Sequence, residues 1–389
     1  MQLRPHQLEA LDKMNTKRLG QVIVPTGGGK TMCMIEDAKK RFTQSSLPQT
    51  IVVVAPRILL ASQLSAEFLE FITDVDVIHV HSGETHHKST TKADELEYWV
   101  NNSTENLLIF TTYHSLHRVE ETGIEVDTIY FDEAHNSVKK NFFPATEYFA
   151  ENADRCYFYT ATPKHSLAAS KPGMNWSVYG QVLCNVPAPR LVDEGYILPP
   201  KVVVKQLPLV KGRKVMYAED GDNLIETLDD NNIDKTLICA RSTKQIMGLI
   251  SQSDFCLQLK ERGYSWMMIT SKTGAIIDGK KVNRDQFFDT LNEWGKEDGK
   301  KFVVIHHSIL SEGINVSGLE AVIFMRNMDY IGISQSIGRV IRLGSTEKTF
   351  GLVCIPTYDR VGISTAKKVQ AVVDVVFNQG QPAISEIRR

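Results

Sequence analysis

The sequence predicts an α/β protein with two domains, each a parallel sheet covered by helices on both faces. Short apolar segments alternate with longer stretches of helical periodicity, and near-continuous apolar strands are typical of parallel sheets buried on both faces. The second half of the chain repeats this alternation. At 389 residues the chain is too long for one ordinary core and has room for two.

The apolar segments predict strands in both halves, with helices between them. In the first half these strands cover residues 22–24, 51–55, 77–80, 107–110, 128–131 and 156–159. In the second half they cover residues 237–240, 267–270, 302–305, 321–325 and 351–355. Proline-rich segments at 187–190 and 194–200 indicate a hinge. We therefore expect domains at 1–197 and 198–378, followed by a poorly ordered tail at 379–389.

Composition excludes several classes of protein. The chain has a net charge of -2, with 42% hydrophobic and 23% charged residues, as expected of a globular protein. Its apolar runs are too short to span a bilayer, and its first residues lack the apolar region of a signal peptide. We therefore expect a cytoplasmic protein without a membrane partner. The net charge by itself identifies no partner.

The most informative motif follows the first predicted strand, where residues 24–31 read Val-Pro-Thr-Gly-Gly-Gly-Lys-Thr. Glycines let backbone N–H groups close around phosphates, and the N-terminus of the following helix adds a partial positive charge. The Lys30 ammonium is expected to reach the β and γ phosphates, and the Thr31 hydroxyl to bind Mg²⁺. Val24 stands where the strict pattern has glycine. The expected phosphate cradle consists of Thr26, Gly27, Gly28, Gly29, Lys30 and Thr31.

A second motif follows the predicted strand at 128–131. The sequence continues Asp132-Glu133-Ala134-His135, which puts two carboxylates at the carboxyl end of a strand. Ligands of open α/β sheets bind at this edge. We expect Asp132 to bind Mg²⁺, and Glu133 to orient and deprotonate the attacking water. The two motifs together predict a nucleotide hydrolase that uses Mg²⁺.

These motifs resemble motifs I and II of the superfamily 2 helicases, with the second spelled as a DEAH box. Further segments resemble the family's other motifs in their usual order: 3–7 (Q motif), 55–57 (Ia), 111–113 (Ib), 160–163 (III), 309–315 (V) and 335–342 (VI). The resemblance runs from Arg4 to Arg342 and so covers most of the chain. It implies two RecA-like domains with the ATP site in the cleft between them.

The resemblance also implies roles for single residues. Arg4 and Gln7 are expected to bind the adenine edge. Arg339 and Arg342, three residues apart on an expected helix, are expected to reach the γ-phosphate as arginine fingers. The resemblance places Gly313 and Gln335 near the nucleotide. It places Arg57, Thr111, Thr112 and Ser311 against nucleic acid, and gives His135, Thr160 and Thr162 a role in coupling the two sites.

The spelling of the motifs bears on the substrate. The DEAH box, the threonine that opens motif III and the sequence at 335–342 depart from the DEAD-box RNA helicases. The sequence at 335–342 and the short two-domain layout are similar to those of DNA-directed members related to type III restriction motors, UvsW and RecG. We therefore favour DNA over RNA, with unwinding or branch remodelling as the activity. Two alternatives stay open: an RNA helicase with a divergent box, and a non-unwinding subunit that gives ATP-gated grip to a nuclease or repair complex.

Histidines gather between the third predicted strand and the segment that follows it, at His79, His81, His86 and His87. Such a cluster could bind zinc. The sequence has no neighbouring cysteine and no regular ligand spacing there, which favours a polar surface loop instead.

Overall fold

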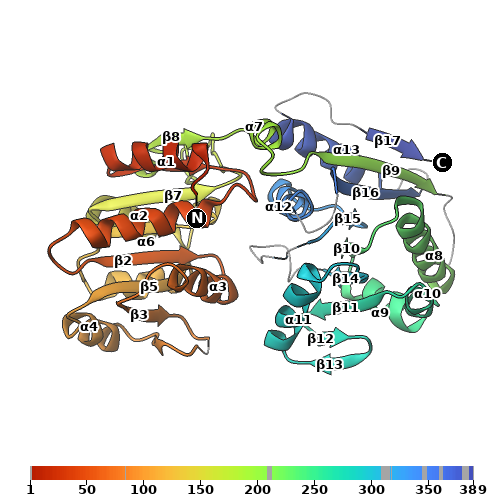
Figure 1. The fold of residues 1–389 in the computed structure, drawn as a ribbon, viewed down its shortest axis with the longest axis horizontal. Coiled ribbons are helices and arrows are strands. Elements are labelled where there is room, and N and C mark those ends of the chain that lie inside the picture. The colour runs from red at the N-terminus through yellow and green to blue at the C-terminus, as the bar shows by residue number, and fades with distance from the viewer. Residues whose placement is uncertain are drawn as a thin grey trace. The chain divides into compact units, whose positions relative to one another are not determined.

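The computed structural model describes residues 2–83, 85–207, 213–307, 316, 318–343, 348–358, 362–378 and 385–388. The chain forms two compact units, Met1–Val186 and Pro187–Arg389, each built on one sheet (Figure 1). Among the helices of the described residues, none combines the length and the apolarity that crossing a bilayer requires.

The first unit is a parallel sheet in the order β4-β3-β5-β2-β6-β7-β1-β8 (Figure 1). Its strands are β1 (Leu19–Ile23), β2 (Thr50–Ala55), β3 (Val75–Val80), β4 (Lys88–Ser89), β5 (Asn106–Thr112), β6 (Thr128–Phe131), β7 (Arg155–Thr160) and β8 (Gln181–Asn185). Its helices are α1 (Pro5–Thr16), α2 (Lys30–Gln44), α3 (Ile58–Leu69), α4 (Ala93–Asn101), α5 (Leu116–Glu121) and α6 (Phe143–Asn152), with short 3-10 helices η1 (Ala134–Asn136) and η2 (Ser177–Tyr179).

Both faces of this sheet are covered. Ile51, Val52, Val53 and Val54 follow one another along β2, and each is 0% exposed. Successive side chains of a strand point to opposite faces, so burial of all four requires packing on both sides. The continuous apolar run in the sequence is the direct consequence, and the expected α/β fold is confirmed.

The second unit contains a mixed sheet in the order β13-β12-β11-β14-β10-β15-β16-β9-β17. Its strands are β9 (Pro200–Leu207), β10 (Lys235–Cys239), β11 (Ser265–Thr270), β12 (Gly274–Ile277), β13 (Lys280–Val282), β14 (Phe302–His306), β15 (Ala321–Phe324), β16 (Gly351–Tyr358) and β17 (Ser385–Arg388). Its helices are α7 (Ala188–Asp193), α8 (Arg213–Asn231), α9 (Thr243–Ser251), α10 (Phe255–Glu261), α11 (Arg284–Lys296), α12 (Tyr330–Val340) and α13 (Ile363–Val372), with a π-helical turn η3 (Val373–Phe377).

Every strand predicted from the sequence is present, but the second sheet has an antiparallel edge that the sequence analysis missed. β12 pairs antiparallel with both β11 and β13. Asp278 and Gly279, which connect β12 to β13, have φ angles of 43° and 81°. Two central residues with positive φ form the turn that suits a tight hairpin. The Asp-Gly pair after Ile276 and Ile277 was the available signal.

The boundary between the two units and the end of the second unit also differ from the expectation. The units divide after Val186, whereas the predicted boundary follows residue 197. The segment between the two positions belongs to the second unit because Ile197 bridges to Arg342, and the Leu198 N–H donates to the Ile341 carbonyl over 2.6 Å. In the expected tail, residues 385–388 add strand β17 beside β9, and residues 379–384 and 389 lie outside the described residues.

The sheet order of the first unit brings the motifs together. Strands β5, β2, β6, β7 and β1 are successive neighbours and all run in one direction. Their carboxyl ends therefore lie along one edge, where ligands of parallel sheets bind. Each of these strands is followed by a segment that the sequence analysis assigned to the site: motif Ib, motif Ia, the DEAH box, motif III and the glycine-rich loop, in the order of the strands.

Candidate functional site

The glycine-rich loop connects β1 to α2 at this edge. Gly27 and Gly29 have φ angles of 83° and 84°, which residues with a side chain rarely adopt. The Gly28 N–H donates to the Pro25 carbonyl over 2.9 Å, and α2 begins at Lys30 directly after Gly29. The loop therefore turns within its three consecutive glycines. The sequence leaves the turn to them, because Val24 stands where the strict pattern has a further glycine.

The first turn of α1 holds the carbonyl groups of this loop. Arg4 Nη1 donates to the Gly27 carbonyl over 2.9 Å, and Gln7 Nε2 donates to the Gly29 carbonyl over 3.1 Å. Between them, His6 Nε2 lies 2.6 Å from the Gly28 carbonyl oxygen. In a trans peptide the N–H points away from the preceding carbonyl, so the N–H groups after these carbonyls face the opposite side. That side is the one on which phosphates would bind.

Arg4 and Gln7 were expected to bind adenine, and the structure gives them a contact that the sequence analysis missed. The Gln7 side chain uses both ends of its amide, because Oε1 also accepts from the Arg4 N–H over 2.8 Å. Binding of the base by these two side chains stays a prediction. His6 was not singled out at all. Its position between Arg4 and Gln7 was the only signal, since contacts with a loop more than 20 residues away leave no local pattern.

The acidic motif follows β6. Glu133 has a φ of 47°, in the left-handed region that is unfavourable for a residue with a side chain. Its Oε1 lies 3.8 Å from Lys30 Nζ, and its Oε2 lies 3.5 Å from His135 Nδ1. The two sequence motifs thus meet in one site, and Glu133 stands between a cation and an imidazole.

Asp132 is buried beside this glutamate. Burial, and next the Glu133 carboxylate, raise the pKa of Asp132 to about 7, while the Lys30 ammonium opposes the rise. A cation that binds here favours the ionised carboxylate, so the site is suited to a metal ion. The Thr31 hydroxyl, at the start of α2, and the Asp132 carboxylate supply oxygen atoms, the donors that Mg²⁺ prefers.

The residues expected to couple the two sites lie in contact with one another. His135 Nδ1 lies 3.0 Å from Thr160 Oγ1, and the Thr162 N–H donates to the same hydroxyl over 3.1 Å. Thr160 ends β7, the strand between β6 and β1. The segment after β7 is therefore connected to the acidic motif through His135.

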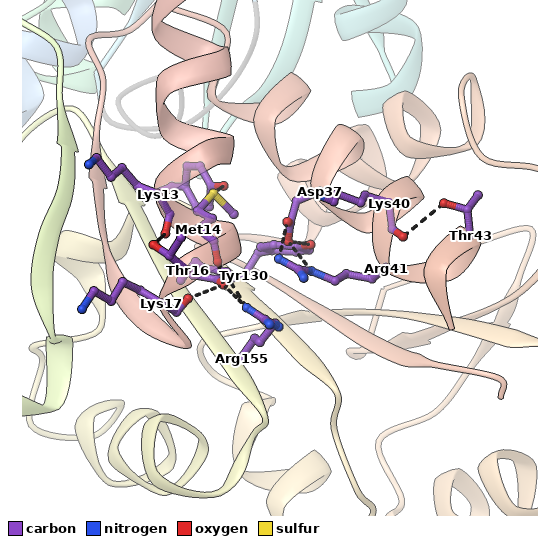
Figure 2. A network of polar contacts seen from close by, with 12 residues as sticks. Lys13, Met14, Thr16, Lys17, Asp37, Lys40, Arg41, Thr43, Tyr130 and Arg155 are labelled. Atoms are coloured by element: carbon purple, nitrogen blue, oxygen red, sulfur yellow. Dashed lines mark hydrogen bonds and ion pairs between the residues drawn. The ribbon is translucent and has the colours of Figure 1, made fainter. Parts of the chain in front are cut away.

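A buried network ties the helix of the glycine-rich loop to the strand of the acidic motif (Figure 2). Tyr130, on β6, donates its hydroxyl to Asp37 Oδ2 on α2 over 2.6 Å. Arg41 Nη2 lies 2.8 Å from the other oxygen of Asp37, whose side chain is 0% exposed. A buried carboxylate with two partners is satisfied, and it sets where α2 lies relative to β6.

The expected nucleic-acid contacts differ in exposure. Arg57 is exposed and precedes the first turn of α3. Thr111 and Thr112 are buried, and their hydroxyls donate to the Val80 carbonyl over 2.9 Å and to Ser115 Oγ over 3.4 Å. The structure directs these two hydroxyls into the unit rather than to its surface. Ser311 lies outside the described residues.

In the second unit the expected pair of arginines does not share a helix. Gln335 and Arg339 lie on α12 and are buried, but this helix ends at Val340. Arg342 lies beyond it, in an antiparallel bridge with Ile197. The expectation of one helical face was wrong, because pairing with Ile197 extends the chain two residues after the helix ends. Gly313 lies outside the described residues.

The family models match both units. Residues 1–165 match the model described as type III restriction enzyme, res subunit. Residues 220–344 match the model described as helicase conserved C-terminal domain. The chain belongs to the superfamily 2 helicases. The resemblance inferred from the motifs is confirmed, and helicase domains of this kind imply an ATPase. No curated protein sequence matches the helicase chain.

Three solved structures similar to this chain are two restriction-modification enzymes and a putative subunit of a third restriction enzyme. The ATP-dependent type ISP restriction-modification enzyme LlaBIII bound to DNA has a TM-score of 0.76 at 16% identity, covering 100% of this chain and 31% of that one. A nuclease-deletion mutant of the type ISP enzyme LlaGI, in complex with a DNA substrate mimic, has a TM-score of 0.65 at 17% identity, covering 99% and 30%. A putative HsdR subunit of a type I restriction enzyme from Vibrio vulnificus YJ016 has a TM-score of 0.63 at 16% identity, covering 99% and 68%.

At these identities the likeness shows the fold. The chain spans about a third of the length of the two type ISP enzymes.

Proposed function

We propose that this helicase is an ATP-driven motor that acts on DNA. The observation that carries the proposal is the meeting of Lys30 and Glu133 at 3.8 Å beneath a glycine-rich loop. A phosphate-binding cation and a general base must lie this close for one site to both bind and hydrolyse a nucleoside triphosphate.

The residues present fit Mg-ATP. The carbonyls of the glycine-rich loop are held by α1, which leaves the opposite side of the loop to phosphate oxygens. Thr31 and Asp132 would hold Mg²⁺, and the ion would neutralise charge on the phosphates when bound. Lys30 would then exchange the Glu133 carboxylate for a phosphate oxygen, since the higher charge attracts the ammonium more strongly.

That exchange sets Glu133 free for its own role. We propose that its carboxylate orients a water molecule and accepts a proton as the water oxygen attacks the γ-phosphorus, with ADP as the leaving group. Arg339 and Arg342 of the second unit are proposed to bind the γ-phosphate, with Gln335 and Gly313 near the nucleotide. His135, Thr160 and Thr162 would connect this site to the strand.

DNA is favoured as the polymer by two independent arguments. The motif spelling is similar to that of DNA-directed helicases, and two of the similar structures are described as bound to DNA or to a DNA mimic. Arg57, which is exposed, is proposed to contact the DNA backbone, together with the segments around Thr111, Thr112 and Ser311. Phosphate contacts carry little sequence information, so binding should depend on DNA structure more than on sequence.

A second candidate function is suggested by the extent of the structural match. This chain covers only 31% and 30% of the two type ISP restriction enzymes, so the fold that it shares with them is one part of a larger enzyme there. In this reading it moves on duplex DNA for a nuclease or repair complex without separating the strands.

One panel of measurements tests these functions together. ATPase rates are measured with single-stranded DNA, duplex DNA, forked DNA and RNA, and strand displacement is followed on the fork with a fluorescent label. Stimulation by DNA with displacement supports a helicase, and stimulation by duplex without displacement supports the second candidate. Stimulation by RNA alone contradicts both and supports an RNA helicase.

A further inference from the structure

A surface of the first unit beside the acidic motif carries exposed basic side chains around one aromatic ring. Lys139 and His114 are exposed, and both contact Phe142. Lys139 Nζ lies 5.6 Å from the centre of the ring, and the imidazole of His114 meets the ring edge to face with the centres 4.6 Å apart. No carboxylate of the described residues pairs with Lys139, whose Nζ instead donates to Asn136 Oδ1 over 2.8 Å.

Asn136 continues this contact to the catalytic glutamate. It is 4% exposed, and its Nδ2 donates to the Glu133 carbonyl over 3.1 Å, while its backbone N–H donates to the same carbonyl over 3.0 Å. Asn136 Nδ2 also lies 3.3 Å from Nε2 of His135. The buried Asn136 amide thus connects the exposed Lys139 ammonium to Glu133 and His135, the two residues of the acidic motif whose side chains face each other.

The conformation of Glu133 explains why this hold matters. A left-handed backbone is unfavourable for a residue with a side chain, so neighbouring bonds must maintain the φ of 47°. The two hydrogen bonds from Asn136 fix the carbonyl of that residue. They therefore hold the backbone position from which its carboxylate reaches toward Lys30 and His135.

We propose that Lys139 binds a phosphate of the nucleic acid and that Asn136 is a positioning residue that transmits this contact to Glu133. The proposal rests on the proposed function for the identity of the polymer. A phosphate oxygen is a stronger partner for an ammonium than an amide oxygen. When Lys139 turns to the phosphate, Asn136 loses its charged donor and holds the Glu133 carbonyl less firmly, which lets the carboxylate leave Lys30 and take up its position at the water.

The test compares three alanine variants of the full chain. Asn136→Ala and Lys139→Ala each remove one side chain of the hydrogen-bonded chain from Lys139 through Asn136 to Glu133. Lys140→Ala is the matched control, because Lys140 is the adjacent exposed lysine and lies outside the chain of hydrogen bonds. For each variant, kcat and KM for ATP are measured with and without saturating single-stranded DNA, and the Kd for DNA is measured by fluorescence anisotropy.

We expect the ratio of DNA-stimulated to basal kcat to fall about fivefold or more in Asn136→Ala and Lys139→Ala. The Kd for DNA should stay within about twofold in Asn136→Ala, which touches no phosphate, and rise in Lys139→Ala. Lys139→Arg should restore the ratio, and Lys140→Ala should keep it. A purely structural role of Asn136 would lower both rates together and leave their ratio unchanged.

Three results would overturn the proposal. The first is a wild-type ratio in Asn136→Ala, and the second is an equal loss in Lys139→Ala and Lys140→Ala. The third is a wild-type ratio in Lys139→Ala. Since Asn136 is buried, its variant can fail to fold, and this third result, at an exposed residue, is then decisive by itself. A wild-type protein whose ATPase no nucleic acid stimulates would contradict the proposed function instead, which keeps the two failures distinct.

Discussion

Lys30 Nζ lies 3.8 Å from Glu133 Oε1, although the two residues follow different strands of the sheet. Each side chain is only 11% exposed, so the ion pair is shielded from water. In the proposed mechanism a phosphate oxygen takes the place of the glutamate beside the ammonium, so binding of the nucleotide and release of the proposed base are connected.

This relationship predicts that both side chains are needed for turnover. We expect Lys30→Ala and Glu133→Gln to lower kcat at least about 100-fold, the usual contribution of a general base. Glu133→Gln should still bind ATP, because the amide has the shape of the acid and Lys30 remains. Rapid-quench ATPase and nucleotide-binding assays measure the two effects, with the exposed Glu97→Gln as control. Wild-type hydrolysis in Glu133→Gln would overturn the assigned base.

The hold of α1 on the glycine-rich loop predicts a specific effect of Gly29→Ala. A Cβ at Gly29 would lie 2.4 Å from Gln7 Nε2, so Gln7 would have to abandon the Gly29 carbonyl. We expect the Kd for ATP to rise about tenfold, measured with a fluorescent analogue. Gly123→Ala is the matched control, since Gly123 also has a positive φ but no atom within 4 Å of the added Cβ. Equal effects of the two variants on ATP binding would show that the contact with Gln7 is irrelevant.

The network in Figure 2 predicts a loss of stability in Tyr130→Phe. The change removes the hydrogen bond to Asp37 and leaves a buried carboxylate oxygen with one partner fewer. A hydrogen bond to a charged group contributes about 2 kcal/mol, so the free energy of unfolding in urea should fall by that amount. Tyr98→Phe, at a position 66% exposed, should leave it unchanged. A similar midpoint for both variants would contradict this account.

The histidines of the first unit predict a dependence of stability on pH. His79 and His81 are buried, so the expected surface loop was wrong for these two, and no cluster suited to a metal ion occurs among the described residues. His79 contacts His81 and Ser65 over 3.0 and 3.1 Å, and its ring stacks on that of His87. Burial, and next His81 and His87, lower the pKa of His79 to about 4 from 6.5.

A depressed histidine pKa means that the folded state resists protonation more than the unfolded state. The stabilising effect is complete above pH 6.5 and is lost as the pH falls toward 4. We expect the free energy of unfolding to fall on the order of 3 kcal/mol across this window, by the usual conversion of the difference between pKa values of 6.5 and about 4. His79→Gln should flatten the dependence, whereas the exposed His86→Gln should not. An unchanged slope in His79→Gln would rule out His79 as its source.

The sequence by itself determined the two-unit α/β fold, the positions of the predicted strands and the segments after them that are candidates for the site. These features rest on patterns within a few residues. A strand buried on both faces must be apolar at successive positions, as β2 is, and a loop around phosphates needs consecutive glycines before Lys30. Parallel strands then bring their carboxyl ends to one edge, which placed both motifs at that edge. The sheet order, which brings Lys30 within 3.8 Å of Glu133, was decided by the tertiary structure.

Only the tertiary structure decided which side chains support these residues. His6 holds the glycine-rich loop, Asn136 holds the carbonyl of Glu133, and Arg342 leaves its helix to pair with Ile197. Most of these contacts join segments far apart in the chain, and they have neither a period nor a spacing that a sequence pattern could reveal. Burial acts in the same way on His79 and Asp132, because the pKa of a side chain depends on what surrounds it in space rather than on its neighbours in the chain.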